Sequence, residues 1–97
     1  MVFYSKNKFI LKRFEKSKRH GKMYDAVLQS KSDSAKFIRI PFGDSTMQNY
    51  GDKTGLNLYP ELIHGDKKRR KNFRSRSRHY VRPGFYSPGY FSYNVLW

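Results

Sequence analysis

The feature that most constrains this chain is the uneven placement of its charge. Residues 67 to 82 contain nine Lys or Arg side chains and no acid, whereas residues 83 to 97 contain no charged side chain and six aromatic rings. The whole chain of 97 residues has a formal net charge of +14. Such a charge repels itself and opposes compact folding, and an anionic partner would relieve that repulsion. The basic block is therefore predicted to lie on the surface and to face a partner.

The length and composition predict one small folded domain. A chain of 97 residues can build a single modest core, and aromatic side chains, which bury large areas, make up 18% of it. There is no Cys, which excludes a disulfide framework and a thiolate zinc site. No apolar run is long enough for a membrane span, and Lys6, Lys8 and Lys12 interrupt the segment where a signal peptide would need apolar residues. We expect a soluble protein that is not secreted.

Alternating apolar side chains predict a β-hairpin over about residues 22–42. Two segments repeat apolar residues at every second position, and the turn-forming stretch SKSDSA separates them. Pro41 cannot donate to a β-ladder, so its strand is expected at an edge of the sheet or near its end. The alternating residues are Tyr24, Ala26, Leu28, Ile38, Ile40 and Phe42.

Two helices are predicted after a long loop. Residues 41 to 62 are rich in turn-forming side chains and suggest an ordered loop with one short helical turn. Asp66 follows Gly65 and is suited to cap a basic helix over about residues 67–80, in which Phe73 and Tyr80 would share one face. Ser87 and the proline after it are suited to start a short aromatic C-terminal helix.

These elements predict an α+β fold with a single small domain at residues 23–97. Residues 1–22 are interpreted as a basic N-terminal arm, and the same segment could also form a strand with a basic exit. We find no internal repeat.

The basic residues are the candidate binding site for an anionic partner. A helix over the block would be about 24 Å long, which suits several successive phosphates of a duplex. Six of its nine basic residues are Arg, whose planar guanidinium group matches both phosphate and carboxylate oxygens. A solvated basic face or a localisation signal is the simpler alternative. The candidate residues are Lys67, Lys68, Arg69, Arg70, Lys71, Arg74, Arg76, Arg78 and Arg82 in the block, and Lys12, Arg13, Lys18 and Arg19 in the arm.

Aromatic residues lie among these charges at Phe14, Phe73 and Tyr80. Bases stack on such rings in proteins that bind single strands, but filling the core of a small domain is the commoner role. No pattern of an RNA-recognition sheet or a zinc finger is present, so sequence-specific readout has no support.

His64, Asp66 and His79 are the residues that catalysis or metal binding would use. In one helix His79 would lie too far from Asp66 for direct contact, so we favour structural roles. His64 would be oriented by hydrogen bonding, and Asp66 would cap the helix and pair with Arg69 or Arg70. No nucleophile elbow, P-loop or HExxH motif is present. We predict no enzyme, no catalytic residue, no cofactor and no metal site; a small nuclease using His64 and Asp66 is the remaining enzymatic alternative.

The segment RIPFGDSTMQNYGDKTGLNLYPELIHGDKKRRKNFRSRSRHY, followed by SPGYFSYNVLW, resembles a family of small basic proteins encoded by nucleocytoplasmic large DNA viruses. The resemblance covers residues 23 to 97; it departs from the family pattern at Phe73, where Tyr is more usual, and in the longer spacing of RSRSRHY. The matching positions are Phe42, Gly43, Tyr50, Asp52, Lys53, Thr54, Gly55, His64, Asp66, Arg69, Arg70, Phe73, His79, Leu96 and Trp97.

The resemblance implies a viral context and no particular chemistry. In that context we expect a minor capsid or cement protein of the virion, soluble in the infected cell before assembly. Its arginines would pair with acidic surfaces of capsid or other virion proteins, and its aromatic tail would fill pockets on them, as Arg, Tyr and Trp do at interface hot spots. The alternative is a nucleic-acid-binding protein that packages DNA without sequence specificity. The expected interface anchors are Tyr90, Phe91, Tyr93 and Trp97.

Overall fold

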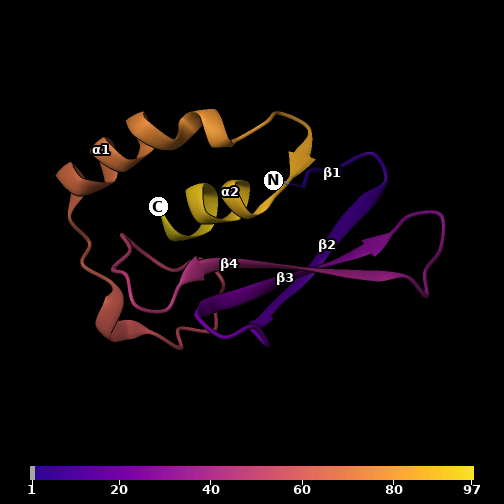
Figure 1. Cartoon of the computed structure of the whole chain (residues 1–97), viewed down its shortest axis with the longest axis horizontal. Helices are drawn as coiled ribbons and strands as arrows, with labels where there is room; N and C mark the ends of the chain where they lie inside the picture. The colour runs from indigo at the N-terminus through magenta and orange to yellow at the C-terminus, as the bar shows by residue number, and fades with distance from the viewer. Residues whose placement is uncertain (1) are drawn as a thin grey trace.

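The computed structural model describes residues 2–97 and shows two small antiparallel sheets covered by helices on one side (Figure 1). The larger sheet has the strand order β2 (Phe9–Lys16), β3 (Lys22–Ser30), β4 (Phe37–Asp44). The smaller one pairs β1 (Tyr4–Ser5) with β5 (Phe85–Tyr86). The predicted α+β class with one small domain is confirmed.

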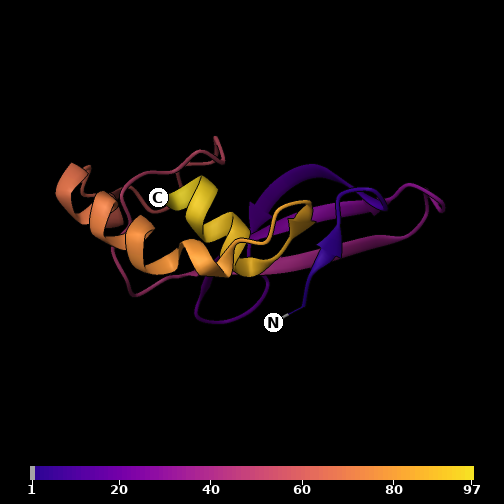
Figure 2. The same ribbon diagram turned by 90° about the horizontal axis from the view of Figure 1, so that it is seen from above.

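The helices follow the predicted order and use the predicted caps. The basic helix α1 (Lys67–Ser77) continues as the 3-10 turn η2 (Arg78–Tyr80), and a further 3-10 turn, η1 (Pro60–Leu62), ends the long loop. The chain closes with α2 (Pro88–Phe91) and the π-helical turn η3 (Ser92–Leu96). The two views agree that α2 lies beside α1, and Figure 1 shows it between α1 and the sheet (Figures 1 and 2).

The hairpin of β3 and β4 has the register that its apolar alternation requires. Tyr24 pairs with Phe42, and the next two pairs on the same face are Ala26 with Ile40 and Leu28 with Ile38. β4 is an edge strand of the sheet, which explains how Pro41 is accommodated there. The predicted hairpin is confirmed.

The N-terminal segment is part of the sheet, so the interpretation of residues 1–22 as an arm outside the domain is wrong. β2 pairs with β3 from Phe9 to Lys16, and its register shifts between Leu11 and Arg13. This β-bulge lets Leu11 and Phe14, three positions apart, both pack against the core. The bulge breaks the period of two and weakens the sequence signal, but the alternative interpretation of the segment as a strand is confirmed.

The core forms where the C-terminal segment packs on the sheet. Phe91 of α2 is fully buried, and its ring centroid lies 5.4 Å from that of Phe42 and 5.9 Å from that of Phe14. Gly43 permits the close approach of η3, because a Cβ atom there would lie 2.9 Å from Leu96 Cδ1 and its φ is +76°. The buried apolar residues around these contacts are Met23, Tyr24, Ala26, Leu28, Ile40, Phe42, Phe91, Val95 and Leu96.

Replacing Phe91 tests whether this packing holds the fold together. We expect Phe91→Ala to lower the free energy of unfolding by about 3–5 kcal/mol, because the ring is removed from a closed core. Phe37→Ala is the matched control: Phe37 is 48% exposed, and its loss should cost less than about 1 kcal/mol. Urea unfolding followed by circular dichroism measures both, and equal losses would contradict the assignment.

Candidate anion-binding surface

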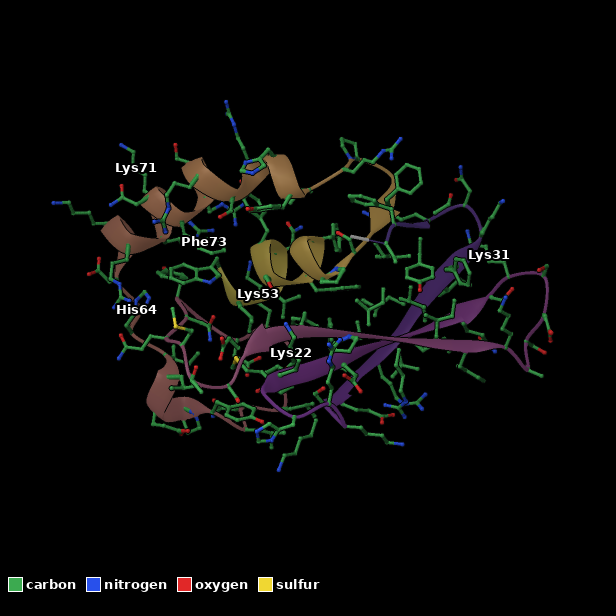
Figure 3. The ribbon with its side chains drawn as sticks, in the orientation of Figure 1. Lys22, Lys31, Lys53, His64, Lys71 and Phe73 are labelled. Carbon is green, nitrogen blue, oxygen red and sulfur yellow. The ribbon has the colours of Figure 1, made fainter. Side chains whose placement is uncertain are left out.

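Helix α1 presents most of its charge to solvent, and none of its residues is buried. Figure 3 shows Lys71 pointing away from the molecule, whereas Phe73 points from α1 toward the C-terminal segment. The helix therefore separates an outer basic side from an inner aromatic side. We define the α1 surface as the exposed basic residues of α1 together with the first residue of η2, which are Lys67, Lys68, Arg69, Lys71, Arg76 and Arg78.

Two of the predicted arginines are engaged inside the chain. Arg70 Nε donates to the main-chain oxygen of Trp97 at 2.7 Å, and an Arg74 guanidinium nitrogen donates to that of Tyr93 at 3.1 Å. The Arg74 guanidinium carbon also lies 4.0 Å from the centroid of the Tyr93 ring. These arginines satisfy carbonyl groups at the end of the C-terminal helical segment, where a helix lacks internal donors. The sequence signal for this role is the spacing of four residues, which places both on the same side of α1 as Phe73.

The remaining predicted arginine of the block, Arg82, is exposed beyond the end of η2. Its guanidinium carbon lies 4.6 Å from the centroid of the Phe85 ring and 5.6 Å from that of Phe3. It therefore packs on the smaller sheet and extends the basic surface past the helix.

The predicted aromatic anchors contact their own chain. Phe91 is fully buried in the core, so its expected role as an anchor for a neighbour is wrong. Trp97 stacks on Phe73 with ring centroids 4.2 Å apart and an angle of 8° between the planes. Tyr90 and Tyr93 are half-buried, and Lys6 Nζ lies 4.2 Å from the Tyr90 ring centroid. An uncharged aromatic tail finds the nearest apolar surface, which is the sheet of its own domain.

His64 and Asp66 organise the start of α1. The amide of Asp66 donates to His64 Nδ1 at 2.8 Å, and the Asp66 carboxylate accepts from the amides of Lys68 and Arg69 at 2.9 and 3.2 Å. The Arg69 and Lys68 amides hold the pKa of the Asp66 carboxyl below its usual value. Burial, and then the Arg69 charge, lower the pKa of His64. The predicted cap and the hydrogen-bonded His64 are confirmed, whereas among residues 2–97 Asp66 forms no ion pair with Arg69 or Arg70 because its carboxylate is turned to the main-chain amides.

The third residue of the suggested cluster lies elsewhere. The ring of His79 packs on Tyr80, with centroids 4.2 Å apart. Among residues 2–97, no three His or acidic side chains lie close enough together to hold a metal ion. Tyr80, which was expected to dock beside Phe73, is 49% exposed. It lies at the end of η2, where a 3-10 turn has replaced the α-helix.

Six of the seven acidic side chains are used inside the fold, the seventh, Glu61, is exposed, and among residues 2–97 none forms an ion pair with the α1 surface. Four of them cap turns or the start of α1, and each accepts from a main-chain amide two residues further along. Two more, Glu15 and Asp25, pair with arginines of the sheet. In the part of the chain that the structure describes, Arg13 and Arg39 are the only basic side chains within 4.0 Å of a carboxylate. Arg13, a predicted binding residue, is thus already paired. The four capping acids are Asp33, Asp44, Asp52 and Asp66.

The other predicted N-terminal residues lie away from α1. Lys12 is exposed at the bulge of β2, and Lys18 and Arg19 are exposed in the turn that joins β2 to β3. Figure 1 shows this turn at the lower side of the molecule and α1 at the upper side. The predicted binding residues therefore form separate surfaces, which the sequence could not distinguish.

A groove lies beside α1 and combines charge with apolar side chains. It has a volume of about 480 Å³ and runs between α1, the loop after β4 and the end of the chain. Arg69 donates to the side-chain oxygen of Gln48 at 2.9 Å across it. Among its lining residues are Met47, Arg69, Phe73, Arg76 and Trp97.

No family model, curated protein or solved structure matches this chain. The resemblance to the viral family therefore stays a prediction. Within residues 2–97, no helix combines the length and the apolar composition needed to cross a membrane.

The lowered pKa of His64 predicts a loss of stability in mild acid. The folded state disfavours protonation of His64. The free energy of unfolding is therefore highest above the unfolded pKa of about 6.5 and falls as the pH drops below that value, where the unfolded chain binds more protons than the folded one. Protonated Nδ1 also cannot accept from Asp66. We expect the Tm of the wild type to fall more between about pH 7.5 and about pH 5.5 than that of His64→Asn, whose side-chain oxygen can accept without titrating in this range. Identical falls would contradict this role for His64.

Proposed function

We propose that this protein binds nucleic acid through the α1 surface without reading the base sequence. The observation that supports the proposal is that, among residues 2–97, no carboxylate lies within 4.0 Å of an exposed basic group of α1, since six of the seven acids bind in turns or pair with Arg13 and Arg39. A net charge of +14 on so small a domain attracts a polyanion strongly.

The shape of the surface suits a phosphate backbone. α1 has 11 residues and is about 16 Å long, and duplex DNA places one charge per about 1.7 Å of its axis. The α1 surface includes three lysines, whose flexible side chains reach phosphates as point charges, and three arginines, whose planar guanidinium groups can bind two phosphate oxygens at once. Such contacts release counterions and position a protein on a duplex, but they carry no sequence information.

The second candidate is the minor structural protein of a large DNA virus particle, located in the virion. The groove beside α1 favours it, because Arg69 and Arg76 lie there together with Met47, Phe73 and Trp97. Arginine beside exposed apolar and aromatic groups suits an acidic segment of a capsid protein better than it suits bare phosphate. We place this candidate second because the Phe91 side chain is buried in the core of its own domain and cannot fill a pocket on a neighbour.

A salt titration distinguishes the two candidates. Fluorescence anisotropy with a random-sequence duplex should show tight binding whose log K falls linearly with log salt between about 50 and about 200 mM. The triple variant Lys67→Gln, Lys68→Gln, Lys71→Gln should lower the steepness of that line by about 2 to 3, since each lost phosphate contact removes about 0.9.

Its matched control removes the same charge at the far end of the hairpin, through Lys8→Gln, Lys31→Gln and Lys36→Gln. We expect this control to change the slope by less than about 1. Wild-type binding that disappears by about 150 mM salt would argue against nucleic acid and in favour of an acidic protein partner.

A further inference from the structure

We propose that the turn between β2 and β3 is a second nucleic-acid-binding surface, so that one molecule bridges two duplex segments. This inference rests on the proposed function and adds a second duplex segment as a binding partner. We define the turn surface as Lys16, Lys18 and Arg19, which are all exposed.

The turn surface surrounds a shallow hollow. The hollow has a volume of about 430 Å³, and Lys16, Lys18, Arg19, His20 and Tyr59 are among the residues that line it. Three basic side chains and a histidine around one concavity provide converging donors for phosphate oxygens. Tyr59 adds an aromatic wall to this basic site.

The turn is held by hydrogen bonds to the buried Asp25 and to the end of β4, which fix its shape within the chain. Asp25 is 2% exposed, and its carboxylate accepts from Ser17 Oγ at 2.7 Å and from the Lys18 amide at 3.3 Å. The Gly21 carbonyl accepts from the Ser45 amide at 3.0 Å, which joins the turn to the end of β4. The cations are therefore displayed from a fixed backbone.

The acids near the turn leave its charge available. Asp25 is engaged with Ser17, the Lys18 amide and Arg39, whose guanidinium nitrogen lies 3.6 Å from the carboxylate. Asp44 faces Lys22 across the β3 and β4 ladder and accepts from Thr46. For this reason we leave Lys22 out of the turn surface.

A single duplex cannot contact both surfaces. Figure 1 shows α1 and the turn on opposite sides of the molecule, with the sheet and the C-terminal segment between them. The molecule measures 41 × 26 × 20 Å. Duplex DNA has a persistence length of about 50 nm and does not fold back around an object of this size at small cost. A duplex held on the α1 surface therefore leaves the turn surface free for another segment.

A two-duplex capture experiment tests the bridge. A random-sequence duplex is fixed to beads, the protein is bound and washed, and a second, fluorescent duplex is added. The wild type should retain the second duplex. The variant Lys16→Gln, Lys18→Gln, Arg19→Gln should change affinity for the first duplex by less than about threefold and lower capture of the second by about tenfold or more, because three phosphate contacts are lost.

The hairpin-end variant at Lys8, Lys31 and Lys36 is the control of equal charge. Figure 3 shows Lys31 at the end of the hairpin, away from the β2 and β3 turn. This variant should capture the second duplex as the wild type does. Equal losses in the two triple variants would overturn the assignment of the turn surface, because total charge alone would then explain capture.

The remaining outcomes separate the two proposals. Failure of the wild type to bind the first duplex would overturn the proposed function itself. Binding of the first duplex without capture of the second would overturn the bridge and leave the proposed function intact. Full capture by the turn variant would also overturn the bridge, since it would mean that two self-associated molecules, and not two surfaces of one molecule, join the duplexes.

Discussion

The packing of the C-terminal segment on the sheet is the contact on which the basic helix depends. α1 has no buried residue and too many like charges to be stable alone. Its place is set by the stacking of Phe73 on Trp97 and by the two arginines that donate to main-chain oxygens of Tyr93 and Trp97. The uncharged tail thus has two contact sides, one against the sheet and one against the helix. Charge can be concentrated on α1 because apolar burial elsewhere offsets its repulsion.

The acidic side chains show how a strongly basic chain folds without neutralising itself. Four carboxylates satisfy main-chain amides locally, at turns and at the start of α1. Glu15 and Asp25 meet Arg13 and Arg39 on the sheet. The four capping acids each stabilise a particular backbone conformation, and among residues 2–97 no acid forms an ion pair with the α1 or turn surface. Local order and long-range attraction therefore use different residues.

Local signals made much of the fold predictable. The hairpin alternation, the edge position of Pro41 and the caps at Asp66 and Ser87 each depend on a few neighbouring residues. The strand β2 was predicted only as the alternative to an arm, because its bulge between Leu11 and Arg13 interrupts the alternation. The sequence could predict that the basic block lies at the surface, but it could not predict that the basic residues of the β2 and β3 turn form a separate surface. Whether an arginine faces a partner or a carbonyl of its own chain depends on tertiary packing, as does whether Phe91 meets a neighbour or its own sheet.

The hydrogen-bonded acids also make the charge of this protein insensitive to acidity. Arg13 holds the pKa of Glu15 below its usual value, and Thr46 and the Arg69 amide do the same for Asp44 and Asp66. Lys and Arg side chains as a class titrate near pH 10 and above. The chain has 21 Lys and Arg side chains against three His side chains. If the proposed function holds, release from a polyanion is therefore expected mainly from competing ions, a rival polyanion or covalent neutralisation such as lysine acetylation.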